Sequence, residues 1–454
     1  MASSAYREVT DTDLDRVWRP FTQHSVRDIP PTFVEGHGCI VTDAEGNEYL
    51  DSMSGLCCVN VGYGQERVIE AATAQLRQLA FTSPGHPAPV TYEFAEKLVD
   101  VLPGNLNHVM FVTSGSEANE LAIKIARQYA RQKFPGQKRS KIIGRYLNYH
   151  GWTFGANSAS GQLQRKVPYE PFLPGFLHVR PPEMYRLFAG MAPSDVAREL
   201  ARELEHVIEL EGPETVAAFI GEPIVAGGGI IVPPDEYWPL MRQICDKYGI
   251  LMIYDEVVTG FGRTGKMFAS EHWGAVPDVI AMGKGISSGY VPLGAVAVTD
   301  EVFDAFLGDS DDNVHVAQVS TFGGHPVACA AALASLTLIE DLGLVANAAA
   351  MGGRFLEGLR SLQDRHAVVG DARGKGLLCG LELVDPHTNE PMPVAQVDEL
   401  VKEGHRRGVV LHRISAIAPG RESIFILGPP LVISAAEIDR LLEVLDDVLG
   451  AAAS

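Results

Sequence analysis

Three short stretches of the sequence place reactive side chains where apolar, strand-like runs end. The first is Ser114–Asn119, which follows the apolar run 109–112 and opens a helical pattern. Free N–H groups at a helix start, together with the positive end of the helix dipole, favour the binding of a phosphate. Ser116 would add a hydroxyl to such a site. A capping turn without any ligand has the same composition, so this stretch does not decide its function by itself.

The other two stretches are centred on Asp255 and Lys284. Asp255 ends the apolar run 250–254, at the carboxyl edge of a sheet, where its carboxylate could pair with a buried cation such as a protonated pyridine nitrogen. Capping of the next helix is an equally good interpretation of Asp255. Lys284 stands between two glycines directly after the run 279–282. Its amine could form an imine, although most lysines lie in solvated turns.

The combination of the three stretches narrows the chemistry. A phosphate site, a carboxylate for a pyridine nitrogen and an imine-forming lysine are the three anchors that pyridoxal 5'-phosphate (PLP) requires. They occur in that order at the ends of successive predicted strands. The sequence therefore predicts a PLP site at one edge of a sheet.

The elements that must position these residues follow from hydrophobic patterning. Short apolar runs alternate with helical spacers through the middle of the chain, which predicts a mostly parallel sheet covered on both faces. A hairpin is expected over 36–51. Helices are predicted over 66–80, 117–133 and 326–342, and strands over 109–112, 141–147, 217–220, 250–254, 279–282, 294–298, 380–384, 409–412 and 424–427.

This pattern predicts an α/β fold with two unequal domains. The larger would hold a mostly parallel mixed sheet covered by helices, and the smaller α+β domain would be built from the N- and C-terminal segments. We expect an N-terminal arm and part of the small domain over 1–60, the large PLP-binding domain over 61–330, and the rest of the small domain over 331–454.

Composition excludes several classes of function. The 454 residues carry a formal net charge of −20 without a basic stripe, which argues against a nucleic-acid partner. The six cysteines form no C-x-x-C pair and no zinc-like cluster with histidine, so we expect free thiols in a reducing compartment and no metal site. No signal-peptide pattern opens the chain, and no apolar run approaches the about 20 residues of a membrane span. The sequence therefore predicts a cytoplasmic protein without a membrane partner.

As a set, the motifs resemble those of the class III (ω-) aminotransferases of PLP fold type I. The similarity runs from about Trp18 to about Ile438. The matching runs are Ser114–Asn119, Asn148–Gly151, Gly221–Pro223, Asp255–Val257 with Gly260–Gly265, Gly283–Gly285, and Thr321–Pro326.

The resemblance implies a role for each matching residue. Lys284 would bind PLP covalently and then move a proton between the substrate carbon and the cofactor. Asp255 would pair with the ring nitrogen, while Tyr149 and Val257 would cover the two faces of the ring.

Further residues would complete the cofactor site. Gly115 and Ser116 would hold the phosphate, and Glu222 would line the pocket near the ring hydroxyl. Thr321 would reach the phosphate bound by the neighbouring subunit, so the resemblance implies a homodimer with shared active sites, with further pairing into a tetramer left open.

The substrate region is similar to the polyamine, taurine and ω-amine–pyruvate branch of the family. Many of those enzymes carry tryptophan at or beside Cys57, so cysteine would give the pocket a wider wall. Arg413 aligns best with the arginine that binds the substrate carboxylate in related enzymes, and Arg421 in the long loop Ile414–Ser423 is its rival. The run Arg19–His24 resembles the N-terminal segment that roofs the site.

The resemblance favours an ω-amino acid or amine:pyruvate aminotransferase in which the amine donor and the keto acid react in turn. Taurine:pyruvate transfer is the nearest alternative. A PLP isomerase or decarboxylase shares the same anchors. The sequence does not rank the amine donors, and it leaves pyruvate and 2-oxoglutarate open as acceptors.

Overall fold

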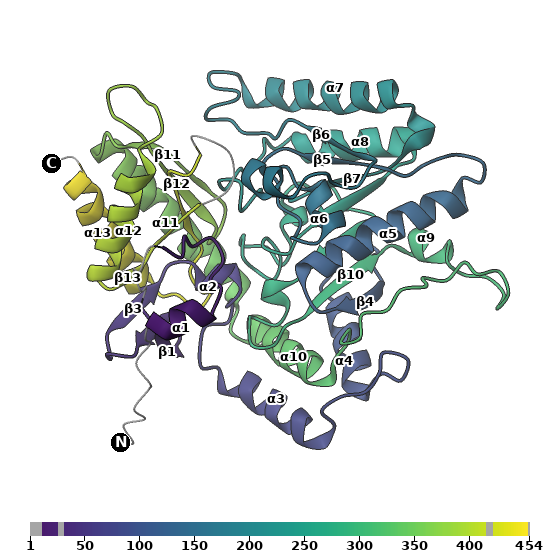
Figure 1. Ribbon diagram of the computed structural model, residues 1–454, viewed down its shortest axis with the longest axis horizontal. Helices are drawn as coiled ribbons and strands as arrows, with labels where there is room; N and C mark the ends of the chain where they lie inside the picture. Colours follow the sequence, from purple (N-terminus) through teal and green to yellow (C-terminus); the bar gives the residue numbers. More distant parts are fainter. Residues whose placement is uncertain (1–10, 26–30, 415–420, 453–454) are drawn as a thin grey trace.

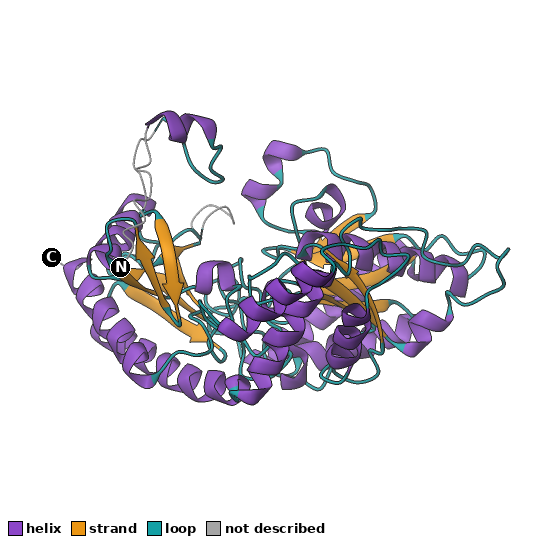
Figure 2. Ribbon diagram, turned by 90° about the horizontal axis from the view of Figure 1, so that it is seen from below, coloured by secondary structure: helices purple, strands orange, loops and turns teal. Residues whose placement is uncertain are grey.

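The computed structural model describes residues 11–25, 31–414 and 421–452. The chain forms two lobes, and the smaller of them is built from both ends of the described sequence (Figure 1). Figure 2 shows the lobes side by side, each with strands covered by helices. The residues of the three sequence motifs belong to the larger lobe.

The large lobe is organised around a seven-stranded sheet in the order β4-β10-β9-β8-β7-β5-β6. All neighbouring strands are parallel except β10, which is antiparallel to both β4 and β9. The predicted mostly parallel mixed sheet is thus confirmed. Its strands are β4 (His108–Val112), β5 (Lys141–Arg145), β6 (Phe176–Val179), β7 (Val216–Gly221), β8 (Leu251–Asp255), β9 (Val279–Met282) and β10 (Gly294–Val298).

Helices cover this sheet, and one of them begins at the carboxyl end of β4. The side chain of Ser114 accepts a hydrogen bond from the backbone N–H of Glu117, which starts a helix immediately after β4. The helices of this lobe are α3 (Glu66–Gln78), α4 (Pro89–Val99), α5 (Gly115–Lys133), α6 (Phe154–Ala159), α7 (Pro193–Glu211), α8 (Tyr237–Tyr248), α9 (Asp300–Asp304) and α10 (Pro326–Asp341). Short 3-10 turns are η1 (Leu163–Arg165), η2 (Val167–Tyr169), η3 (Pro213–Thr215), η4 (Ala269–His272) and η5 (Lys284–Ile286).

The small lobe contains two four-stranded sheets, in the orders β1-β2-β3-β13 and β11-β12-β15-β14. Its strands are β1 (Phe33–His37), β2 (Ile40–Asp43), β3 (Glu48–Asp51), β11 (Val369–Gly374), β12 (Cys379–Leu383), β13 (Val409–Val410), β14 (His412–Arg413) and β15 (Ile424–Leu427). The helices are α1 (Asp11–Arg16), α2 (Ser54–Cys57), α11 (Leu344–Arg365), α12 (Val394–Arg406) and α13 (Ala435–Ala452).

The expectation of one strand over 409–412 is wrong. Val409 and Val410 pair in parallel with β3, whereas His412 and Arg413 pair with β15 in the other sheet. The buried Leu411 lies at the crossing point. A continuous apolar run cannot reveal that its two halves join different sheets, because each half has the same local pattern.

Within the described ranges, no single helix has the length and hydrophobicity of a membrane span. Helices α10 and α11 reach those values only together, and they are bent by 63° at their junction.

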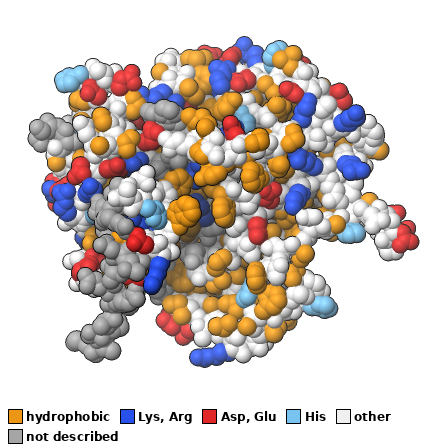
Figure 3. All heavy atoms as spheres, in the orientation of Figure 1, with side chains coloured by type: hydrophobic (Ala, Val, Ile, Leu, Met, Phe, Trp, Pro, Cys, Tyr) orange, Lys and Arg blue, Asp and Glu red, His pale blue; other side chains and the backbone are white. Residues whose placement is uncertain are grey.

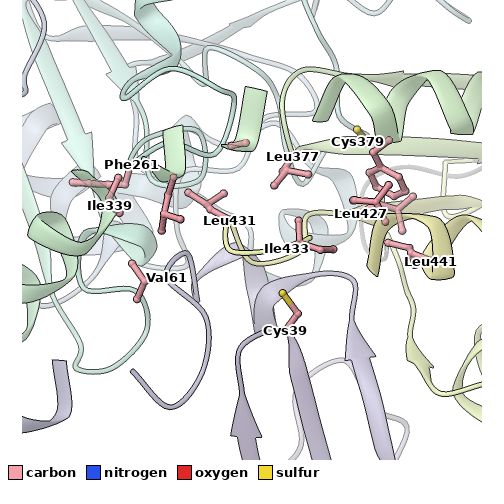
Figure 4. Packing of buried hydrophobic residues seen from close by; sticks show 14 of the residues in the cluster. Cys39, Val61, Phe261, Ile339, Leu377, Cys379, Leu427, Leu431, Ile433 and Leu441 are labelled. Carbon is pink, nitrogen blue, oxygen red and sulfur yellow. The ribbon is translucent and has the colours of Figure 1, made fainter. Parts of the chain in front are cut away.

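The hydrophobic core joins the two ends of the chain to its centre. Figure 4 shows Cys39, Val61, Leu377 and Leu431, which come from four distant segments, within one buried cluster. All six cysteines are free thiols and five of them are buried. Burial raises the pKa of Cys245 to about 12, so this thiol stays protonated and behaves as an apolar side chain.

Among the residues that the structure describes, Arg263 links the lobes through hydrogen bonds rather than through an ion pair. Its guanidinium is fully buried and donates to the side chains of Ser54 and Asn60 at 2.9 and 2.8 Å. It also donates to the carbonyl oxygens of Leu377, at 3.2 Å, and Pro429. Three separate stretches of the small-lobe side of the seam therefore meet on one side chain of the large lobe.

We expect Arg263→Met to lower the free energy of unfolding by roughly 3 kcal/mol, because several buried acceptors would lose their donor at once. Thermal denaturation followed by circular dichroism would measure this loss. Arg198→Met is the matched control, since Arg198 pairs on the surface with Asp195 and is 54% exposed. Equal melting temperatures for both variants would contradict the structural role of Arg263.

Candidate active site

The structure brings the three sequence motifs into contact at the carboxyl edge of the large sheet. A Cβ atom added to Gly115 would lie 2.8 Å from Cγ1 of Val257. One added to Gly283 would lie 3.2 Å from Cα of Gly115. The turns before α5 and after β9 therefore pack backbone against backbone, which only glycine allows, and the side chain of Val257 after β8 lies against both turns.

Asp255 is held firmly at the end of β8. Its carboxylate is 4% exposed, and one oxygen accepts from the side-chain amide of Asn119 and lies 2.8 Å from Nδ1 of His150. The other oxygen accepts from the backbone N–H of Val257 at 3.0 Å. No helix starts after Asp255, since the next element in the described chain is η4. The helix-capping interpretation of Asp255 is therefore wrong.

Lys284 lies at the start of η5, half-buried among buried neighbours. Its φ of 45° is in the left-handed region, which lysine rarely adopts. A Cβ atom at the following Gly285 would lie 2.5 Å from the amide nitrogen of Asn60. This strained and tightly packed position does not match a lysine in a solvated surface turn.

The start of α5 forms the opposite side of the site. The first backbone N–H groups of a helix have no partners within the helix, and here they belong to Gly115 and Ser116. The hydroxyl oxygen of Ser116 accepts from the backbone N–H of Trp152 at 3.3 Å. A Cβ atom at Gly151 would lie 2.6 Å from that hydroxyl, so the loop after β5 packs directly on the helix start.

Glu222 fixes the position of the Tyr149 backbone through a hydrogen bond. One of its carboxyl oxygens accepts from the backbone N–H of Tyr149 and the other from that of Ala226, both at 2.9 Å. Burial, and then the negative charge of Asp255, raise the pKa of Glu222 to about 7. Burial also raises the pKa of the Tyr149 hydroxyl, against the opposing effect of the positive charge of Arg165.

The two arginines predicted to bind the substrate are both occupied by carboxylates. Arg413 forms a two-pronged ion pair with Asp398. Arg421 donates to the buried Glu183 at 3.1 Å. Residues 415–420 of the loop between them lie outside the described residues. Neither arginine presents a free guanidinium, and their assignment as substrate ligands stays a prediction.

Cys57 and Thr321 lie in contrasting surroundings. Cys57 is 3% exposed and belongs to a hydrophobic cluster between the lobes, whereas the neighbouring Cys58 is half-buried. Thr321 is exposed on this chain, and among the described residues no hydrogen bond joins it to the strand tips. A role for Thr321 at an active site would therefore depend on a second copy of the chain.

A cavity of about 950 Å³ opens beside the loop after β5. The predicted N-terminal cover forms one of its walls. The lining residues are Trp18, Arg19, Pro20, Phe21, Thr22, Gln23, Tyr149, Trp152, Phe154, Asn157, Gln164, Arg165, Tyr169 and Phe172. Arg165 was not predicted as a site residue from the sequence, because a single arginine in an irregular segment has no pattern that separates it from a surface residue.

His150 and Asn119 were also missed as contributors to the site. Both stand inside motifs that the sequence singled out, but only the structure shows that they bind the same carboxylate oxygen of Asp255. Their partner is more than a hundred residues away in sequence, so local patterning could not pair them.

The donor set fits PLP. The N-terminus of α5 offers N–H groups and a hydroxyl to a phosphate, and the buried carboxylate of Asp255 offers a negative charge to a protonated ring nitrogen. Lys284 supplies the amine, and the glycine contacts leave bare backbone beside it. Each of the three groups that PLP needs is thus present at one sheet edge.

Comparison with known proteins decides the family. The family model for aminotransferase class-III matches residues 21–449. The chain belongs to the class-III aminotransferases. It is therefore a PLP-dependent enzyme that transfers amino groups, and the resemblance stated from the sequence motifs is confirmed.

Individual class-III aminotransferases are similar over nearly their full length. A taurine–pyruvate aminotransferase of Bilophila wadsworthia is 40% identical, over 97% of this chain and 96% of its own. A putrescine–pyruvate aminotransferase of Pseudomonas aeruginosa is 39% identical, over 90% and 88%. Among solved structures, an (S)-enantioselective omega-transaminase from Thermomicrobium roseum has a TM-score of 0.92 at 40% identity and covers 98% of both chains. An aminotransferase of Bacillus anthracis has the same TM-score at 42% identity, over 97% of both chains.

Proposed function

We propose that this aminotransferase moves an amino group from an amine or ω-amino acid to pyruvate. The observation that supports the proposal is the contact between the three strand-tip turns that carry Gly115, Asp255 and Lys284. The choice of pyruvate is supported by the taurine–pyruvate and putrescine–pyruvate relatives.

The residues around the site divide the binding of PLP among them. Gly115 and Ser116 would hold the phosphate, and Asp255 would keep a proton on the ring nitrogen, while Asn119 and His150 hold one of its carboxyl oxygens in place. When bound, PLP supplies an aldehyde for the amino group and a pyridinium ring that takes up electrons as a substrate C–H bond breaks.

Tyr149 and Val257 would orient the ring by packing on its two faces. The backbone of Tyr149 is fixed by Glu222, and Val257 is fixed because its N–H donates to Asp255. Glu222 would lie near the ring hydroxyl with its buried carboxyl group. A flat apolar ring between two such side chains is favourable because both faces are shielded from water.

Lys284 is the proposed catalytic base. Its Nζ accepts a proton from the substrate carbon that carries the amino group and returns a proton when the keto acid collects that group. The left-handed backbone at Lys284 and its two glycine neighbours fix the direction from which the amine approaches. Amine donor and keto acid use the same site in turn.

We propose that the enzyme works as a homodimer, with Thr321 completing the site of the second subunit. Large hydrophobic side chains are exposed around the cavity mouth and near Thr321, among them Trp152 (80%), Tyr92 (62%) and Phe322 (56%). Figure 3 shows one face on which hydrophobic side chains cover much of the centre. A second copy of the chain would bury such surface. The free thiols support a reducing, cytoplasmic location.

Absorbance spectroscopy of the holoenzyme tests the proposal. We expect a yellow protein whose visible band disappears when an amine donor is added alone and returns when pyruvate follows. Taurine, β-alanine, putrescine and 1-phenylethylamine, each tested against pyruvate and 2-oxoglutarate, would identify the donor class and the acceptor. Turnover of an amine without any keto acid would instead indicate an isomerase or decarboxylase.

A further inference from the structure

Arg165 differs from Arg413 and Arg421 because, among the described residues, aromatic rings rather than carboxylates surround its charge. Its guanidinium carbon lies 4.3 Å from the ring centre of Tyr149 and 4.6 Å from that of Phe21. Among the residues that the structure describes, no carboxylate pairs with it. Its Nε is buried and has no hydrogen-bond partner.

An unpaired guanidinium in such a place is costly, since aromatic faces replace only part of the hydration that burial removes. Burial lowers the pKa of Arg165 below its ordinary value, as expected for a cation without a full counter-charge. By contrast, Arg413 and Arg421 are each neutralised by a carboxylate. Of these three arginines, Arg165 is the one without a carboxylate partner among the described residues and is therefore prepared to receive an anion.

We propose that Arg165 binds the acid group of the amino donor, a carboxylate or sulfonate at the end opposite the amine. This inference rests on the proposed function and names the substrate class of the same site. A guanidinium offers paired N–H donors that match two oxygens of either group. The side chain of Asn157 donates to the carbonyl oxygen of Arg165 at 2.8 Å and so helps to fix the residue in the cavity wall.

The position of Arg165 connects the cavity to the reacting centre. It contacts Tyr149, which Glu222 anchors, and it shares the cavity with Trp152, whose N–H donates to Ser116 at the helix start. An acid group on Arg165 would thus lie beside the proposed cofactor site, which suits a short donor whose acid and amine are separated by few carbons. On its other side Arg165 holds Phe21, so the same side chain joins the N-terminal cover to the bound acid.

Binding of two unreactive acids to the holoenzyme tests the inference. Ethanesulfonate and propionate carry the acid groups without an amine, and tryptophan fluorescence would report their binding because Trp18 and Trp152 line the cavity. The wild type should give a saturable change with one or both acids. Arg165→Met should weaken that binding by about 10- to 100-fold, the value of a hydrogen-bonded charge pair. Arg165→Lys should retain part of the affinity, since it keeps the charge but loses the paired donors.

Three variants provide comparisons. Arg198→Met, on the surface of α7, should bind both acids as the wild type does. Arg413→Met and Arg421→Met test the rival ligands, and loss of acid binding in either, with Arg165→Met unaffected, would overturn the inference. The acid that loses more affinity in Arg165→Met identifies the sulfonate or the carboxylate as the preferred group.

A failure of this inference can be distinguished from a failure of the proposed function. Transfer from 1-phenylethylamine to pyruvate needs no acid group on the donor, so this reaction of the wild type tests the proposed function independently of the acid-binding measurements. If the wild type transfers this amine but neither acid binds, or if Arg165→Met binds both acids normally, the inference fails while the proposed function stands. If the wild type transfers no amine to any keto acid, the proposed function itself fails.

Discussion

Replacing Lys284 with alanine is expected to abolish amino transfer, with kcat/KM falling by about 10⁴-fold or more. The variant loses both the amine that binds PLP covalently and the base that moves the substrate proton, and proton transfer alone is worth about 10²- to 10⁴-fold. Borohydride reduction followed by mass spectrometry would show the mechanism directly. Wild-type protein should gain the mass of the reduced cofactor at residue 284, and the variant should gain none.

The control for this experiment is Lys266→Ala. Lys266 is exposed and belongs to the same lobe, but it is not part of the strand-tip contacts. It should keep both the cofactor adduct and full activity. A Lys284→Ala protein that still carried covalently bound PLP would place the reactive amine elsewhere and remove the assignment.

Asp255→Asn should produce the second-largest loss, a drop in kcat of roughly 10²- to 10³-fold together with weaker retention of PLP. The substitution removes the charge that stabilises a protonated ring nitrogen. It also turns an acceptor into a donor where Asn119 and His150 already donate or approach at 2.8 Å. Breaking a buried charge pair in this way costs about 3–5 kcal/mol, which corresponds to the expected range in rate.

Asp278→Asn is a matched control on the same sheet. Asp278 accepts from Arg242 at 2.7 Å and from the backbone N–H of Met252 at 2.6 Å, at the end of the sheet away from the site. It should lower the melting temperature without changing the absorbance of bound PLP. If Asp255→Asn likewise lost only stability and kept its kcat, Asp255 would have no role at the ring nitrogen.

The strand-tip part of the site could be predicted because its residues sit at the ends of regular elements. The runs before Ser114, Asp255 and Lys284 are short and apolar, and the structure places strands β4, β8 and β9 there. In a mostly parallel sheet the carboxyl ends of strands meet at one edge, so the order of the runs along the chain was enough to bring these motifs together.

The substrate side could not be predicted in the same way, because its residues lie in irregular segments. Arg413 looked like a free ligand from its alignment, but only the fold shows that Asp398, on α12, reaches its guanidinium. Arg165 lies on a single 3-10 turn, and its neighbour Phe21 belongs to the N-terminal segment, far away in sequence. Whether a cation is neutralised depends on such distant partners, and no local pattern records them.

The four hydrogen bonds of Arg263 have a consequence for how donors and products reach and leave the active-site cavity. Separating the two lobes at their interface would remove all four acceptors from the buried guanidinium of Arg263 at once. An opening of the whole enzyme at this interface therefore costs much free energy. The segment from Trp18 to Gln23, which forms one wall of the cavity, contacts the opposite wall through the stacking of Phe21 on Arg165. We therefore expect donors and products to enter and leave on the side of the cavity that this segment covers, while the two lobes stay together.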